Sequence, residues 1–184
     1  ALTTADIDLF AVASGPGSFT GLRIGIAAIQ GLASVHRRPV APVSVLRALA
    51  EAAARQQRSG VRVGAWMDGR RHEVFTALYD IVESGTPGRA AVLVEVEAAR
   101  VDSPAATLTR WAALGQPAVI CGDGAVLYAD QVSAQAQVLA PPPLAEHIGR
   151  LAPDSTPGSP AAVHPLYVRR TDVEIARDAS AARR

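Results

Sequence analysis

The sequence predicts an α/β protein made of two lobes. A short apolar run at 7–13 is followed by a glycine-rich turn and then by apolar residues at helical spacing, the order of a buried strand and a helix. Alternating apolar and polar residues begin after Ser59-Gly60, which indicates a β-hairpin that opens a second lobe. Aromatic residues make up only 4% of the chain, so its core must consist mainly of Ala, Val, Leu and Ile.

The first lobe, residues 1–58, is predicted to hold one clear strand and two helices. The strand runs to Ser14 and is typical of strands buried on both faces. Ser18 or Thr20 can cap the following helix, expected over 19–33. One apolar stripe runs along that helix at steps of four, three and four: Leu22, Ile26, Ile29 and Ala33. A short extended segment at 39–41 and a helix at 44–57 complete the lobe.

The second lobe, residues 59–170, is predicted to begin with strands at 61–67 and 72–79 and a third strand at 90–96. Ser103-Pro104 then starts a helix that ends at Gly115, with Leu108, Trp111 and Ala112 facing inward. A strand at 119–121 and helices at 125–134 and 144–151 follow. Residues 171–184 form a charged tail that we do not expect to pack.

The charge pattern excludes several functions. All 18 basic residues are arginine, so a P-loop, which needs a lysine on the phosphates, and Schiff-base chemistry are excluded. The formal net charge is +1, and the arginines are spread along the sequence rather than clustered. Direct recognition of RNA is therefore not expected from the sequence.

The cellular location is predicted from the cysteine count and the hydropathy. Cys121 is the single cysteine, so the chain forms no internal disulfide and is compatible with a reducing compartment. It lies in an apolar strand pattern, which favours a small buried side chain. No stretch approaches the ~20 apolar residues of a membrane span, and the first residues resemble no signal peptide. We expect a cytoplasmic protein.

The segment GPGSFTGLRIG, residues 15–25, is the most distinctive part of the sequence. A glycine-rich turn before a helix can hold a phosphate, which would lie near Gly15, Gly17, Ser18 and Thr20. It can equally serve a tight turn with nothing bound. Gly21 and Gly25 lie one helical turn apart, where each costs up to about 1 kcal/mol relative to alanine. Either a second helix approaches closely there, or the helix packs tightly within its own lobe.

Other catalytic patterns are weak. The four histidines stand far apart and lack the spacing of metal ligands. Neither the serine-hydrolase elbow nor the dinucleotide fingerprint fits residues 15–25 in detail. Asp68 and Glu73 form the best carboxylate pair, although a turn-forming Asp and an exposed strand Glu explain them equally well.

Three segments resemble the TsaB (YeaZ) family of bacterial tRNA threonylcarbamoyladenosine biosynthesis proteins. They are GPGSFTGLRIGIAAIQGLA, DGRRHEVF at 68–75 and PLYVRR at 165–170, and the resemblance extends to Arg170. Members of that family start with a strand, a hairpin carrying an Asp-Thr motif and a helix before the part that corresponds to Ala1. The resemblance therefore implies that the first lobe is incomplete in this chain.

The resemblance also implies a fold and a role. The fold is the actin-like, Hsp70-type ATPase (ASKHA) fold, with two lobes of mixed sheets and flanking helices. The role is that of a non-catalytic subunit, without cofactor or metal, which binds the catalytic paralogue TsaD, with the ATPase TsaE as third component. Alone it would form a homodimer, and it would meet tRNA only through the complex.

The resemblance implies two sets of site residues in the glycine-rich segment and the helix that follows it. The partner interface would comprise Gly21, Leu22, Gly25, Ile26 and Ile29. A vestigial phosphate loop would comprise Gly15, Gly17, Ser18 and Thr20. The alternative is a nucleotide-dependent enzyme of the same fold that uses this loop, and a glycoprotease has the least support from the residues.

Overall fold

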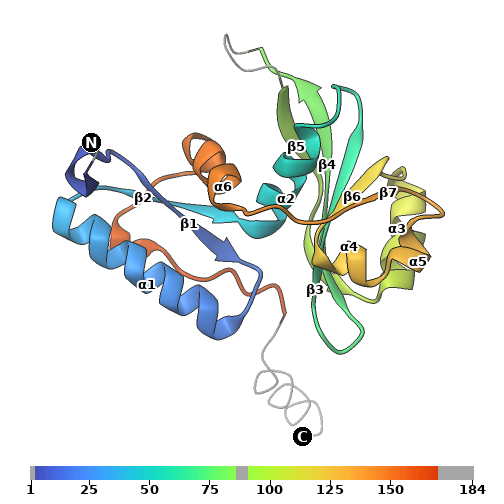
Figure 1. Ribbon diagram of the computed structural model, residues 1–184, viewed down its shortest axis with the longest axis horizontal. Helices are drawn as coiled ribbons and strands as arrows, with labels where there is room; N and C mark the ends of the chain where they lie inside the picture. Colours follow the sequence, from blue (N-terminus) through green and yellow to red (C-terminus); the bar gives the residue numbers. More distant parts are fainter. Residues whose placement is uncertain (1–2, 86–90, 170–184) are drawn as a thin grey trace, which may run out of the picture.

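The computed structural model describes residues 3–85 and 91–169, which form two sheets with helices around them (Figure 1). The first sheet pairs β1 (Phe10–Gly15) with β2 (Val40–Ser44) in parallel, and α1 (Phe19–His36) connects them. Short 3₁₀ helices lie at Thr4–Asp6, Ala152–Asp154 and Pro160–Ala162. Among the described residues, β1 pairs with β2 alone. Its burial alternates, because Phe10 and Val12 are buried while Ala11 is only half-buried, so the prediction of two fully buried faces was wrong.

The second sheet has five strands in the order β5-β4-β3-β6-β7. They are β3 (Arg62–Asp68), β4 (Val74–Glu83), β5 (Ala91–Asp102), β6 (Val119–Cys121) and β7 (Gln137–Leu139). The first three are antiparallel, and β6 and β7 run parallel to β3, so the sheet is mixed. The predicted hairpin is confirmed, and β5 is longer than expected. Strand β7 was not predicted.

The remaining helices are α2 (Val45–Ala54), α3 (Pro104–Leu114), α4 (Asp123–Leu127), α5 (Ala129–Val132) and α6 (Ala145–Leu151). The predicted start of α3 is confirmed, because the Ser103 hydroxyl accepts a hydrogen bond from the Ala106 backbone N–H. The single helix predicted at 125–134 is instead two short ones that meet at Tyr128. None of the helices in the described part of the chain has the length and apolarity of a membrane span.

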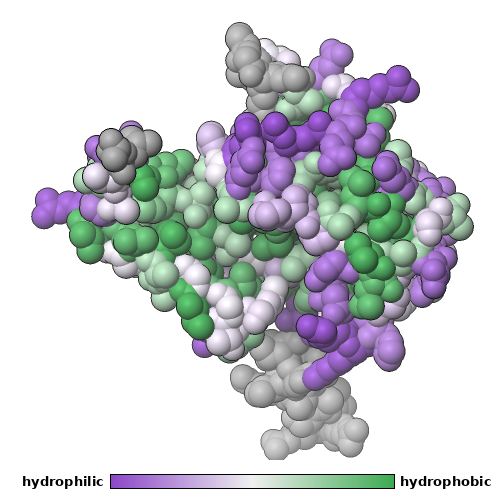
Figure 2. All heavy atoms as spheres, viewed as in Figure 1, coloured by the Kyte–Doolittle hydropathy of each residue, from purple (hydrophilic) through white to green (hydrophobic). Residues whose placement is uncertain are grey.

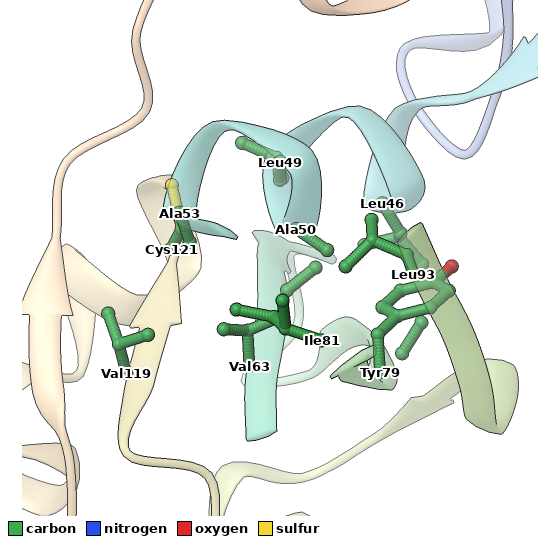
Figure 3. Close-up of a cluster of buried hydrophobic side chains, with 12 residues drawn as sticks. Leu46, Leu49, Ala50, Ala53, Val63, Tyr79, Ile81, Leu93, Val119 and Cys121 are labelled. Atoms are coloured by element: carbon green, nitrogen blue, oxygen red, sulfur yellow. The ribbon is translucent and has the colours of Figure 1, made fainter. Parts of the chain in front are cut away.

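Both faces of the second sheet are covered. Figure 3 shows Leu46, Leu49, Ala50 and Ala53 of α2 above Val63, Ile81 and Val119 of the sheet. The other face carries Trp66, Val74 and Leu78, which pack against Leu108 and Trp111 of α3. Ala112, which was expected to face inward on α3, is exposed. Thr107, which was not expected to face inward, is buried instead. A Cβ on Gly64 would lie 2.5 Å from the Trp111 ring, so Gly64 makes room for the indole.

The division into lobes is less simple than a boundary at 59–60. The sheets do separate there, but α2 of the first segment contributes its apolar face to the core of the second sheet. Near the end of the described chain, Gly158 pairs with Val40 on β2, and the Leu166 backbone N–H donates to the Ser14 carbonyl at 2.7 Å. Residues 158–166, which were predicted to belong to the second lobe of 59–170, therefore pack against the first lobe. The predicted tail at 171–184 lies outside the described residues.

Candidate functional site

The turn between β1 and α1 lies where the chain returns to the first lobe. Gly15 has a φ of 125°, and a Cβ on it would lie 2.7 Å from the Leu166 carbonyl oxygen. A side chain there would both strain the backbone and push the returning segment away. Gly15 is therefore explained by close backbone packing.

The other residues predicted to form the vestigial phosphate loop surround the first turn of α1. Of the two predicted capping residues, Ser18 is the N-cap, and its hydroxyl accepts a hydrogen bond from the Gly21 N–H at 3.3 Å. A Cβ on Gly17 would make ordinary contact with Leu22, and Thr20 is exposed. Packing and capping thus explain Gly15 and Ser18, while the assignment of these residues to a vestigial phosphate loop stays a prediction.

Helix α1 has two apolar faces. Ile26 is 4% exposed and packs with Phe10, Val12 and Ala33, and Ile29 is partly buried against the same cluster. Leu22 is half-buried, and its side chain lies next to Gly15 and Gly17. The expectation that Leu22, Ile26 and Ile29 offer apolar area to a partner is therefore corrected, because these side chains stabilise the first lobe itself.

The outward face of α1 carries a second apolar stripe. Ile24 is 65% exposed and Val35 is 77% exposed, with Leu32 and Ala28 also in solvent. Gly21 is exposed, and a Cβ on Gly25 would meet nothing within 4 Å. We call the residues Gly21, Ile24, Gly25, Ala28, Leu32 and Val35 the outer face of α1. Figure 2 shows hydrophobic residues gathered over the part of the molecule that contains α1.

The outer face could have been found in the sequence. Ile24, Ala28, Leu32 and Val35 recur at steps of four, four and three, which is also helical spacing. Two stripes on one helix are consistent with either one facing the core. Of the predicted interface residues, Gly21 and Gly25 remain accessible to a second helix, Ile26 is buried, and Leu22 and Ile29 are half-buried against the first lobe.

The hairpin between β3 and β4 approaches the same turn from the second lobe. Its tip contains three consecutive non-glycine residues with positive φ: Arg70 at 59°, Arg71 at 55° and His72 at 60°. This left-handed conformation costs roughly 1–2 kcal/mol for each L-residue. The Gly69 N–H donates to the Glu73 carbonyl and the Glu73 N–H donates to the Arg70 carbonyl, so backbone hydrogen bonds hold the tip.

Aromatic and basic side chains meet between the hairpin and α1. The rings of Phe19 and Tyr167 stack with centroids 5.7 Å apart. The Arg23 guanidinium lies 4.0 Å from the centre of the Phe19 ring, and its Nε donates to the Tyr167 hydroxyl at 3.1 Å. Arg169 lies 5.3 Å from the centre of the Phe75 ring and is paired with Glu73. The cluster joins both lobes to the returning segment.

A cavity of ≈ 470 Å³ opens beside this cluster. Its wall includes Pro16 and Phe19 from the first lobe and Arg70, Arg71 and Phe75 from the second. Tyr167 and Arg169 of the returning segment complete it. The cavity is thus lined by cations, rings and the glycine turn.

The remaining candidates have structural partners. Asp68 pairs with Arg70 at 3.1 Å within the hairpin, and Glu73 pairs with Arg169 of the returning segment. Each carboxylate of the predicted pair thus has a structural partner. His147 of α6 pairs with Glu51 of α2 and joins those helices. In residues 3–85 and 91–169, no group of three or more His, Cys, Asp or Glu side chains could hold a metal ion.

The Cys121 thiol is expected to react slowly with disulfide reagents. It is 1% exposed on β6, and burial raises the pKa of the thiol to about 11. Because the thiolate is the nucleophile and the usual pKa is 9.0, the reactive fraction at pH 8 falls about 100-fold before access is considered. Labelling with a chromogenic disulfide should therefore be at least ~100-fold slower for the folded chain than for the chain in urea, and should accelerate as the pH rises. Equal rates in both states would contradict the buried position.

Comparison with known proteins identifies relatives of this chain. The family model described as "TsaD: tRNA N6-adenosine threonylcarbamoyltransferase" matches residues 1–118. Over 80 residues, the chain is 45% identical to the tRNA threonylcarbamoyladenosine biosynthesis protein TsaB of Escherichia coli, a match that covers 44% of this chain and 34% of that protein. The chain belongs to the TsaB (YeaZ) members of this family. TsaB of Bacillus subtilis is 33% identical over 94 residues, covering 49% of this chain and 40% of that protein.

Solved YeaZ structures extend the match along the chain. YeaZ from Pseudomonas aeruginosa has a TM-score of 0.70 at 29% identity, and the match covers 90% of this chain and 76% of that one. A second Pseudomonas aeruginosa structure, described as similar to peptidase YEAZ, has the same TM-score and identity with 91% and 76% coverage. The chain spans about a third of the length of the curated TsaB relatives that it matches.

Proposed function

We propose that this chain is a non-catalytic subunit in the formation of threonylcarbamoyladenosine in tRNA, and that it binds a catalytic TsaD-type paralogue. The curated relatives are named as biosynthesis proteins of this modification, and the matching family model is described as the transferase itself. The exposed apolar face of α1 is a surface on which a partner of similar fold can pack. An ASKHA-type arrangement of the two lobes, with TsaE as a third component, belongs to the same proposal.

The observation that carries the proposal is the outer face of α1. Ile24, Leu32 and Val35 expose apolar area along a helix of 18 residues, while Gly21 and Gly25 remove the side chains that would keep a second helix at a distance. Exposed apolar patches of this kind mark interaction surfaces. We propose TsaD as the occupant, with a second copy of the chain on the same face when TsaD is absent.

The test substitutes single residues on that face. Ile24→Glu is expected to weaken binding to TsaD of the same organism roughly 100-fold or more, because the carboxylate would lose water without gaining a partner. Gly25→Leu is expected to weaken binding as well while leaving the thermal midpoint at or above that of the parent chain, since the new side chain meets nothing within 4 Å. Titration calorimetry measures the affinities.

Leu127→Glu is the matched control. Leu127 on α4 is 59% exposed, close to the 65% of Ile24, but lies outside the outer face of α1. We expect this variant to keep its affinity for TsaD. If Ile24→Glu binds TsaD as tightly as the parent chain, or if Leu127→Glu loses as much affinity for TsaD, the outer face of α1 is not the interface. Tight binding of Mg-ATP that Thr20→Val abolishes would instead favour a nucleotide-dependent enzyme.

A further inference from the structure

Strand β5 forms one edge of the five-stranded sheet. In residues 3–85 and 91–169 it pairs with β4 alone, although it is 12 residues long. The backbone groups along such an edge can pair with another chain. The pairing with β4 shifts register twice between Glu95 and Arg100, and bulges of this kind twist an edge away from a neighbour. The stretch from Ala91 to Glu95 keeps a regular register, so the bulges do not protect it.

The backbone groups of Leu93 point away from β4, toward the outer edge. The Ile81 N–H donates to the Val61 carbonyl at 2.9 Å, and the Ile81 carbonyl accepts from the Gly60 N–H at 2.8 Å, so both groups of Ile81 point toward the β3 side. Leu93 lies directly opposite Ile81. In an antiparallel pair, opposite residues either exchange both hydrogen bonds or both turn away from each other. The Leu93 N–H and carbonyl therefore face outward.

The Arg47 side chain already occupies this position on the edge. Its Nη2 donates to the Leu93 carbonyl at 3.1 Å, and its guanidinium lies 5.9 Å from the centre of the Tyr79 ring. Figure 3 shows Tyr79 and Leu93 below the start of α2, beside Leu46. A charged side chain on an edge strand is a known means of preventing sheets from joining. Arg47 thus closes the part of β5 that the bulges leave open.

The closed stretch would be complementary to itself. If two copies of β5 pair antiparallel about a two-fold axis at Leu93, each Leu93 exchanges both outward hydrogen bonds with the other. Val92 then lies opposite Val94 of the second copy, on the same face of the joined sheet. Val94 is 48% exposed, and Val82, which pairs with Val92 across the hairpin, is 42% exposed. Such cross-strand pairs of β-branched residues stabilise a sheet, so a second copy fits this edge.

We propose that the edge of β5 from Ala91 to Glu95 is an interaction surface for a second copy of this chain, and that Arg47 keeps it closed. Pairing there would join two five-stranded sheets into one. This inference goes beyond the proposed docking on the outer face of α1, because it concerns the other sheet and a different kind of contact.

The first test measures self-association by sedimentation velocity. All variants carry Ile24→Glu, which is expected to remove association through the outer face of α1. Arg47→Ala should raise the association constant at least ~100-fold, because neither copy then gives up a charge-assisted hydrogen bond, which is worth roughly tenfold in each. The control Arg58→Ala removes the same charge from an exposed position after α2 and should leave the constant unchanged.

A second variant separates edge pairing from association of a damaged fold. Val94→Lys, added to Arg47→Ala, should return the association constant to that of Ile24→Glu alone, because a lysine on an edge strand opposes pairing. Val94 is about half exposed, so we expect the thermal midpoint to stay unchanged. Association that results from partial unfolding would not be reversed by this exposed substitution.

The register is tested with two further chains in the Arg47→Ala background, one with Val92→Cys and one with Val94→Cys. Opposite residues that share no ladder bond have Cα atoms about 4.5 Å apart, within reach of a disulfide. Each new cysteine and its own copy lie on a diagonal of about 7–8 Å, which is too long. Mild oxidation should therefore link the mixture of the two chains and neither chain alone. Cys121 is buried and should not take part.

The inference fails if Arg47→Ala associates no more than Ile24→Glu alone, or if Arg58→Ala raises association equally. It also fails if Val94→Lys does not reverse the effect, or if each cysteine chain links to itself as readily as to the other. A dimer formed by Ile24→Glu alone would count against self-association through α1. The further increase caused by Arg47→Ala would still report on β5, so the two proposals can be distinguished.

Discussion

Gly122→Ala is expected to prevent stable folding of the chain. A Cβ on Gly122 would lie 1.8 Å from the Trp66 carbonyl oxygen, and the φ of 138° is one that L side chains rarely adopt. Trp66 lies in β3, the central strand of the second sheet, so the backbone cannot move away without breaking the pairing with β4 or β6. We expect a loss of more than about 4 kcal/mol in the free energy of unfolding, a large part of the stability of an ordinary domain.

Urea denaturation followed by tryptophan fluorescence measures this loss. Gly149→Ala is the matched control, because a Cβ on Gly149 of α6 meets nothing within 4 Å. That variant should be neutral or more stable by up to about 1 kcal/mol, since alanine is the better helix former. If Gly122→Ala unfolds at the same urea concentration as the parent chain, the tight turn after β6 is not as described.

Trp111→Ala is expected to cost about 3–5 kcal/mol of unfolding free energy. The indole is 0% exposed, tilts against Trp66 at 5.9 Å between centroids and fills the space that Gly64 leaves open. Its Nε1 donates to Glu97 at 2.7 Å, and the Arg110 guanidinium donates to the same carboxylate at 2.5 Å. The variant would leave a cavity and remove one donor from a buried carboxylate.

The hydrogen bond can be separated from the volume by a pair of phenylalanine variants. Trp111→Phe keeps a ring but leaves Glu97 with one donor fewer, which costs about 1–3 kcal/mol in addition to the smaller volume. Trp66→Phe is the control, because Nε1 of Trp66 is buried without a hydrogen-bond partner. In calorimetric or urea unfolding, Trp111→Phe should be the less stable of the two. The reverse order would show that the bond to Glu97 contributes little.

Local signals in the sequence predicted much of the second lobe. The start of α3 was predicted because Ser103 caps it and Pro104 occupies its first turn. The β3–β4 hairpin was predicted from two alternating runs on either side of the turn at Asp68-Gly69, and it formed although both faces of the sheet are covered. Strand β7 was missed because a run of three residues is too short to show a strand pattern, and it pairs along the edge that β6 offers.

The candidate site depended on information that local patterns do not contain. Both stripes of α1 have helical spacing, and only the position of β1 and β2 determines that Ile26 faces inward and Ile24 outward. The cluster of aromatic and basic side chains joins Arg23 of α1 to Tyr167, a contact that no window of sequence can show. The glycine turn was recognised, but its need for Gly15 arises from Leu166, a residue far along the chain.

The return of the chain from the second lobe to the first has a consequence for biosynthesis. The hydrogen bonds from Gly158 to Val40 and from Leu166 to Ser14 cannot form until almost all the described residues have left the ribosome. Contacts between such distant positions form slowly, since a long loop must close first. The nascent chain therefore exposes β1 and α1 to chaperones until residues 158–166 have been made, and this later segment completes the packing around β1 and β2.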